Sequence, residues 1–258
     1  MVGKSHILNL FPIGIRELLL VGMLLIPLNL NASDEPVLKN KEHVILLHGM
    51  ARSKLSMQPL EEFLTEKGYS VINTGYPSTT ETVEILADKY LADMVAQCIQ
   101  KGADKVHIVT HSLGGVVTRQ YLQNHSLLKG SRIVMISPPN KGSELADLFR
   151  DLSIYKWLNG PAGQVLGTKP ESLPNTLAPI EGEIGVITGD GTLNPLYSWL
   201  IPGDDDGKVS VERAKLDEMA DFIVVPSSHS FIMRHPEVLR QVVFFLKNGV
   251  FEHILCTH

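Results

Sequence analysis

Ser112 occupies a position where a serine hydroxyl could act as a nucleophile. Residues 108–117 read I-V-T-H-S-L-G-G-V-V, so a β-branched apolar run leads into Ser112 and then into two glycines and a helix-forming run. This pattern predicts a nucleophile elbow, a tight strand-to-helix turn that lifts a serine hydroxyl clear of a sheet. Thr110 replaces the first glycine of the usual G-x-S-x-G motif. The expected chemistry is attack on an acyl carbonyl, and the alternative is a Gly-Gly turn with an incidental serine.

His229 is the candidate general base. It lies in P-S-S-H-S at 226–230, after the last predicted strand, where the loop would return to the sheet edge that carries Ser112. A histidine there would accept the serine proton and later deliver it to the leaving group. His48 and His111 follow or end apolar runs, and we expect both to be structural.

A cluster of aspartates at 204–206 supplies the candidate acid that would orient this base. Asp206 is preferred, because Asp-Gly-Lys-Val places a carboxylate in a turn before a short extended segment. Asp204 and Asp205 would then face solvent. Asp190, directly after the preceding predicted strand, is the rival acid. Three carboxylates could also bind calcium, but their spacing is not that of an EF-hand, so we expect no metal.

The stretch L-H-G-M-A-R-S at 47–53 is expected to help form an oxyanion hole. A strand that ends in His-Gly leaves backbone N–H groups pointing outward, and the glycine lets a substrate approach closely. The backbone N–H groups of Met50 and Leu113 are the expected donors.

Together these segments resemble the motifs of lipases and esterases of the α/β-hydrolase superfamily. The resemblance covers roughly residues 43–247 and keeps the family's order: H-G-M-A-R-S at 48–53, T-H-S-L-G-G at 110–115, D-G-K-V at 206–209 and then His229. It implies that Ser112 is the nucleophile, Asp206 the acid and His229 the base, with Met50 and Leu113 as oxyanion donors. It implies no organic cofactor.

The resemblance implies a carboxylic-ester hydrolase that works through an acyl-enzyme. The expected partner is a small-molecule ester or lipid, with peripheral contact to a lipid interface left open. An acyltransferase, thioesterase or amidase would use the same three residues, because the distinction lies in pocket shape and access of water. A non-catalytic lipid-binding protein is the alternative from another class, although binding alone would not require all three. The oligomeric state is not predicted.

Alternating strand-like and helix-like segments predict an α/β fold, a mostly parallel sheet flanked by helices on both faces. The strands are expected at 44–47, 69–74, 106–110, 132–136, 184–188 and 222–225, and the main helices at 58–67, 82–101, 116–123 and 237–247. Residues 145–179 break this alternation, with apolar side chains scattered among prolines. The segment is too long for a bare loop, so we expect short helices that form a small cap or lid, with a surface excursion as the alternative.

The composition is that of a globular protein, with 258 residues, 44% hydrophobic and 20% charged. The net charge of −5 and the absence of a basic run argue against nucleic-acid binding. Lys4 and Arg16 precede an apolar run at 18–30, so residues 1–32 are typical of a signal peptide. The hydrolase domain, 33–258, would then be exported to the periplasm or secreted, or anchored to a membrane if the leader is retained.

Two cysteines lie in the predicted mature part, Cys98 and Cys256. An exported protein could join them in a disulfide. Cys98 falls in a helical pattern where a buried free thiol is equally ordinary, so both readings stay open.

Overall fold

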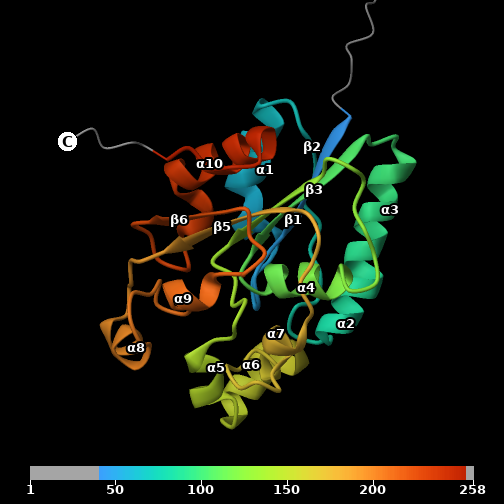
Figure 1. Cartoon of the computed structure of the whole chain (residues 1–258). Helices are drawn as coiled ribbons and strands as arrows, with labels where there is room; N and C mark the ends of the chain where they lie inside the picture. The colour runs from blue at the N-terminus through green and yellow to red at the C-terminus, as the bar shows by residue number, and fades with distance from the viewer. Residues whose placement is uncertain (1–40, 254–258) are drawn as a thin grey trace, which may run out of the picture. The chain divides into compact units, whose positions relative to one another are not determined.

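Six parallel strands form the centre of the fold in the computed structural model, which describes residues 41–253 (Figure 1). Their order in the sheet is β2-β1-β3-β4-β5-β6, and each neighbouring pair is parallel. Their bounds are β1 (Glu42–Leu47), β2 (Ser70–Ile72), β3 (Lys105–His111), β4 (Arg132–Ile136), β5 (Glu183–Gly189) and β6 (Asp221–Val225). The predicted α/β fold is confirmed.

Helices cover both faces of this sheet, which explains why the central strands read as nearly continuous apolar runs. Successive β1 side chains alternate, so that Ile45 and Leu47 enter one core cluster while Val44 and Leu46 enter another. The first cluster packs on α2 (Val83–Ile85), α3 (Ala92–Gln100) and α4 (Leu113–Tyr121). The second packs on α1 (Gln58–Glu66) and α10 (Pro236–Asn248).

The predicted helix at 82–101 is present but not uniform. Between α2 and α3, residues Leu86–Leu91 (η2) form a π-helical turn. Leu86, Ala87 and Leu91 in this turn are all buried. The spacing of apolar residues in the sequence could not reveal the π-helical turn, because such a turn changes that spacing by only one residue.

The irregular segment after β4 holds three short helices, α5 (Glu144–Phe149), α6 (Ser153–Gln164) and α7 (Leu173–Thr176). Gly160 has a φ of 57° and precedes Pro161, so α6 is kinked there. A Cβ on Gly160 would lie 1.7 Å from the carbonyl oxygen of Thr79, so only glycine fits this approach. The predicted short helices are therefore present.

The remaining short elements connect these layers: η1 (Lys54–Met57), α8 (Pro195–Leu200), α9 (Val211–Ala214) and η3 (Ile232–Arg234). Among residues 41–253, no helix has the length and apolar character needed to cross a bilayer. Cys98 is buried in α3. The predicted leader at 1–32 and Cys256 lie outside the described residues.

The chain order reverses beside β1, because β2 lies on one side of it and β3 on the other. Parallel sheets bind ligands in the crevice outside the carboxyl ends of their strands at such a point. The loops that follow β1 and β3 carry the predicted oxyanion donors and the predicted nucleophile. The topology therefore gathers them at one edge of the sheet.

Candidate active site

Ser112 occupies a strained turn between β3 and α4. Its backbone has φ 53° and ψ −119°, a conformation that costs a non-glycine residue energy and that clusters at functional sites. The turn is fixed by two hydrogen bonds: the Ser112 N–H donates to the Ile136 carbonyl, and the Gly115 N–H donates to the Ser112 carbonyl, each over 2.9 Å. This is the strand-to-helix turn that the motif predicts.

The two glycines after Ser112 let α4 pack directly behind the turn. A Cβ on Gly114 would lie 2.8 Å from the Leu47 carbonyl oxygen, and one on Gly115 would lie 2.9 Å from the Cβ of Pro138. Both distances are too short for a real side chain. Thr110, which departs from the usual motif, is buried beneath the turn and tolerated there.

Ser112, His229 and Asp206 form a continuous chain of hydrogen bonds. The Nε2 atom of His229 lies 3.0 Å from the Ser112 hydroxyl, and its Nδ1 atom lies 2.8 Å from a carboxylate oxygen of Asp206. The His229 backbone N–H also donates to the Asp206 carbonyl over 2.8 Å. Asp206 accepts a hydrogen bond from the Nδ1–H group of His229. The Nε2 lone pair therefore faces the serine hydroxyl, which is the arrangement that general-base activation requires.

Asp206 remains an anion although it is buried. Burial, the largest single effect, would raise the pKa of its carboxyl group, but the interactions with His229 and with neighbouring donors together outweigh it, and the pKa is lowered. The nearby Ser137 hydroxyl and the Val209 N–H act in the same direction. The second carboxylate oxygen accepts the N–H groups of Lys208 and Val209 over 3.0 and 2.9 Å.

The other aspartates are separated from His229, and one expectation about them is wrong. Asp190, the rival acid, is exposed after β5, and Asp204 is exposed as predicted. Asp205 was expected to face solvent, yet only 3% of it is exposed. Its carboxylate accepts the Gly207 N–H over 2.7 Å and the Ser198 hydroxyl. The turn folds back on its own side chain, a local contact that aspartate often makes.

The loop after β1 packs against Ser112, the candidate nucleophile. A Cβ on Gly49 would lie 3.1 Å from the Ser112 Cβ and 2.8 Å from the Nδ1 atom of His111, so the glycine is required by contact. Met50 lines the cavity at Ser112, and the Leu113 N–H lies in the first turn of α4, where backbone donors lack helical partners. The roles of Met50 and Leu113 as oxyanion donors remain predictions.

His48 braces that loop. It is buried and stacks on Tyr76 with ring centroids 4.1 Å apart. The Tyr76 N–H donates to its Nε2 atom over 3.3 Å, and the Tyr76 hydroxyl donates to its carbonyl. Burial lowers the pKa of His48, so the ring is neutral.

His111 holds the backbone of the candidate base. Its Nε2 atom donates to the His229 carbonyl over 3.0 Å, and the two ring centroids are 4.8 Å apart. Burial and then the charge of His229 keep the pKa of His111 well below its ordinary value. The sequence indicates a structural histidine here but not its partner, since 118 positions separate the two residues.

A cavity of about 350 Å³ opens at Ser112. One wall comes from the segment after β4 and is apolar, with Leu145, Phe149, Leu158 and Leu166 among its residues. The other wall comes from loops at the sheet edge and includes Arg52 and Lys208, to which the sequence analysis assigns no role. A larger hollow of about 590 Å³, between 122–131 and 179–182, is lined by none of the predicted site residues.

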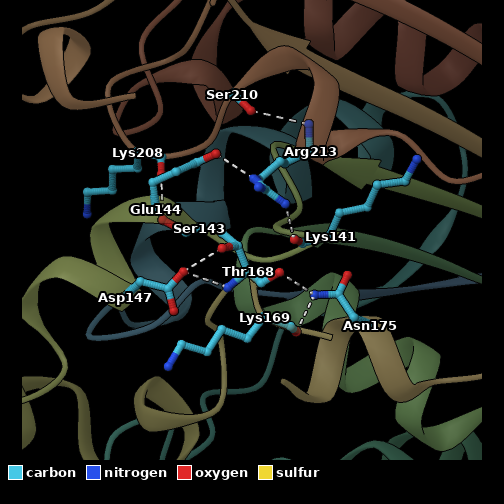
Figure 2. A network of polar contacts seen from close by, with 10 residues as sticks. All are labelled: Lys141, Ser143, Glu144, Asp147, Thr168, Lys169, Asn175, Lys208, Ser210 and Arg213. Carbon is cyan, nitrogen blue, oxygen red and sulfur yellow. Dashed lines mark hydrogen bonds and ion pairs between the residues drawn. The ribbon is translucent and has the colours of Figure 1, made fainter. Parts of the chain in front are cut away.

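A polar network ties the loop of Asp206 to α5 (Figure 2). The Ser143 hydroxyl donates to the Lys208 carbonyl over 2.8 Å, and Glu144 pairs with Arg213. Arg213 also donates to the Lys141 carbonyl over 2.9 Å. The network therefore fixes the backbone beside the candidate acid.

Comparisons with known proteins agree with this fold. A model of the alpha/beta hydrolase family matches residues 44–242. No curated protein matches the chain. Similar solved structures include the mature lipase BlEst2 of Bacillus licheniformis, with a TM-score of 0.64 and 18% identity over 80% of this chain and 92% of that one.

Two further structures show the same fold. Phospholipase PlaB of Legionella pneumophila has a TM-score of 0.62 and 20% identity over 81% of this chain and 59% of its own. A monoacylglycerol lipase of Paleococcus ferrophilus has a TM-score of 0.53 and 16% identity over 81% of this chain and 95% of its own. At these identities the likeness is one of fold.

Proposed function

The chain belongs to the alpha/beta hydrolase family, and from that membership we propose that it hydrolyses carboxylic esters through an acyl-enzyme on Ser112. The observation that carries the proposal is the chain of contacts from Asp206 through His229 to the Ser112 hydroxyl, 2.8 and 3.0 Å long, at the floor of a half-apolar cavity. A nucleophile, a base and an orienting acid in this order are what acyl transfer requires.

In the first half-reaction the Ser112 oxygen bonds to the ester carbonyl carbon while its proton passes to Nε2 of His229. The carbonyl oxygen becomes an oxyanion, which the N–H groups of Met50 and Leu113 stabilise. The ester C–O bond then breaks, and His229 gives its proton to the leaving alkoxide. The products are the free alcohol and an acyl ester on Ser112.

In the second half-reaction water attacks the acyl carbon and gives its proton to His229. The tetrahedral intermediate collapses, the bond to the Ser112 oxygen breaks, and the proton returns to that oxygen. A carboxylic acid leaves. Asp206 stays ionised throughout and balances the positive charge that develops on His229.

The apolar wall of the cavity supports an acyl chain as the group bound there. Leu145, Phe149, Leu158 and Leu166 come from the predicted cap segment, and each removes apolar substrate surface from water. We therefore propose a lipid-like ester rather than a small polar one.

Exposed apolar side chains beside the cavity support contact with a lipid interface. Trp157 on α6 is 76% exposed and Trp199 on α8 is 81% exposed, and both helices supply cavity residues. Phe149 and Tyr197 contact each other between α5 and α8, with ring centroids 5.9 Å apart. Tryptophan is favoured where one part of a ring meets lipid and another meets water. The proposed occupant of this surface is the lipid aggregate that holds the substrate.

We also propose that the domain is exported, on the charge and apolar pattern of residues 1–32. Expression of the full chain followed by fractionation and N-terminal sequencing tests this. A mature form that begins near residue 33 outside the cytoplasm supports export. A full-length form in the membrane fraction supports an anchor, and a full-length cytoplasmic form contradicts both.

Hydrolysis of chromogenic esters with short to long acyl chains tests the proposed activity. We expect turnover by the wild-type protein, loss of turnover in Ser112→Ala, and covalent labelling of the wild type alone by a fluorophosphonate. A folded wild type that neither labels nor turns over would contradict a hydrolytic serine. Labelling without turnover would favour acyl transfer or another acyl bond.

A further inference from the structure

Two cations give the cavity at Ser112 a positive charge. Arg52 follows β1 and Lys208 lies between α8 and α9, and both line the cavity. No aspartate or glutamate is among the residues that line it. The whole chain carries a net charge of −5, so this local excess does not reflect a basic protein.

Neither cation has an ion-pair partner within residues 41–253. No ion pair or side-chain hydrogen bond of the described part joins Arg52 or Lys208 to another residue. The nearest acidic groups on α5 are engaged elsewhere, Glu144 with Arg213 and Asp147 with Thr168. Figure 2 shows the Lys208 side chain extending away from the Glu144–Arg213 pair.

The charge of Arg52 acts on Lys208. The protein atoms around the Lys208 ammonium lower its pKa, and the positive charge of Arg52 lowers it further, against the opposite effect of Asp206. Both charges also lower the pKa of His111, which precedes Ser112 in the chain. Like charges held together without an anion are unfavourable, and an anionic ligand between them would remove that repulsion.

The backbones of Arg52 and Lys208 are fixed close to the reacting groups, while their side chains are exposed. The Lys208 N–H donates to the Asp206 carboxylate over 3.0 Å, and its carbonyl accepts the Ser143 hydroxyl over 2.8 Å. The Arg52 N–H donates to the carbonyl of Gly49, the residue pressed against Ser112. A negative group bound by these side chains would therefore share one cavity with an ester carbonyl at Ser112.

We propose that the substrate is an ester whose alcohol part carries a phosphate group, bound between Arg52 and Lys208. The inference rests on the ester hydrolysis proposed above. The apolar wall takes the acyl chain, which leaves the cationic wall for the alcohol part. A phosphate suits this pair better than a carboxylate does, because its oxygens can accept the arginine fork and still meet a second point charge.

A matched pair of substrates tests this assignment. Monoacylglycerol and acylglycerol 3-phosphate with the same acyl chain differ only in the phosphate. We expect the wild type to prefer the phosphate ester in kcat/KM by about tenfold or more at low salt, and we expect added salt to reduce that preference. In Arg52→Gln/Lys208→Gln the ratio should approach one.

The matched control removes two cations from the other end of the molecule. Lys101 precedes β3 and Lys129 precedes β4, so both lie toward the amino ends of the strands, and both are exposed. Lys101→Gln/Lys129→Gln changes the net charge equally and should keep the wild-type ratio. Equal loss in both double variants would overturn the proposal, because it would reflect overall charge. A wild-type ratio near one would overturn it as well.

Binding to Ser112→Ala separates the phosphate site from the reaction. Calorimetry should show acylglycerol 3-phosphate binding about tenfold more tightly than monoacylglycerol, and more tightly than inorganic phosphate. If this preference is found while the wild type hydrolyses neither ester, the phosphate site stands and the hydrolase proposal fails. If hydrolysis occurs and the two lipids bind equally, or if inorganic phosphate binds better than the lipid, the phosphate proposal fails.

Discussion

The two walls of the cavity are built in opposite ways. On the sheet-edge wall His229 is 4% exposed, and Asp206 behind it is 1% exposed. Both are held by backbone and side-chain hydrogen bonds. On the wall from α5–α7 Leu158 is 48% exposed, and Trp157 beside it on α6 is 76% exposed. Catalytic groups must be held within a fraction of an ångström, whereas an acyl chain needs only apolar surface.

The difference follows from how each wall is attached. The loops of the first wall extend directly from strands of the sheet. The second wall is a set of short helices connected by side-chain contacts such as the Asp147 carboxylate with the Thr168 N–H and hydroxyl, and it is kinked at Gly160. Elements with few buried contacts open at low free energy, so we expect the second wall to be the more mobile.

The largest expected effect lies at the acid of the first wall. Asp206→Asn should lower kcat/KM by about 10⁴-fold, because an amide cannot hold His229 in the required tautomer or balance its charge. Ester hydrolysis measured beside a circular dichroism spectrum checks this. Asp190→Asn is the matched control and should stay within about twofold of wild type. Loss in Asp190→Asn with retention in Asp206→Asn would reassign the acid.

A single methyl group tests how rigid the first wall is. Gly49→Ala should lower kcat/KM by about 10²-fold, because its Cβ must displace His111 or Ser112 and so shift the reacting groups. Gly75→Ala is the control, since a Cβ there meets no atom within 4 Å. Steady-state kinetics and thermal unfolding of both variants provide the measurement. Equal kinetics in the two variants would mean that the first wall adapts to the added methyl group and is not rigid.

The second wall should respond to the physical state of the substrate. Trp157→Ala/Trp199→Ala should lower hydrolysis of a long-chain ester in vesicles by about tenfold, while a soluble short-chain ester should change less than twofold. Ile99→Ala/Val250→Ala removes exposed apolar side chains from other elements and should alter neither. If the tryptophan variant hydrolysed both esters equally poorly, the two tryptophans would act in folding or in the cavity and not at a lipid interface.

The smallest expected effect concerns His111, the buried histidine that precedes Ser112 and contacts the His229 carbonyl. Because the pKa of His111 lies well below 6.5 in the folded protein and returns to about 6.5 on unfolding, its contribution to stability is present above pH 6.5 and is lost as pH falls below it. When the pH falls from 6.5 to 5.5, the unfolding free energy of the wild type should decrease. In His111→Gln that decrease should be about 1 kcal/mol smaller. Urea denaturation at both pH values checks this, and identical pH slopes in the two proteins would refute it.

The sequence predicts the first wall better than the second. Ser112 and His229 could be located because each follows an apolar strand, and strand ends of a parallel sheet meet at one edge. The short helices at 145–179 could be expected from length and apolar content, but their bounds could not. Their positions depend on contacts such as that of Gly160 with Thr79, which no local pattern records.

Side chains whose importance comes from distant partners were missed. Asp205 is buried because its turn closes on Ser198, and Arg52 and Lys208 share a cavity although 156 positions separate them. Propensity and periodicity describe neighbours along a chain. They carry no information about two loops that meet only after the sheet has formed.

Three non-glycine residues adopt positive φ, Ala51 at 52°, Ser112 at 53° and Ser137 at 48°, and they follow β1, β3 and β4, which are neighbours in the sheet. Glycine at any of them would relieve strain on the order of 1 kcal/mol. Laboratory selection for heat tolerance would therefore favour glycine at these three positions in a definite order. Ala51→Gly comes first, because it removes only a methyl group. Ser137→Gly comes second, because it also removes the hydroxyl that acts on Asp206. Ser112 cannot be replaced in a protein that must keep the proposed activity.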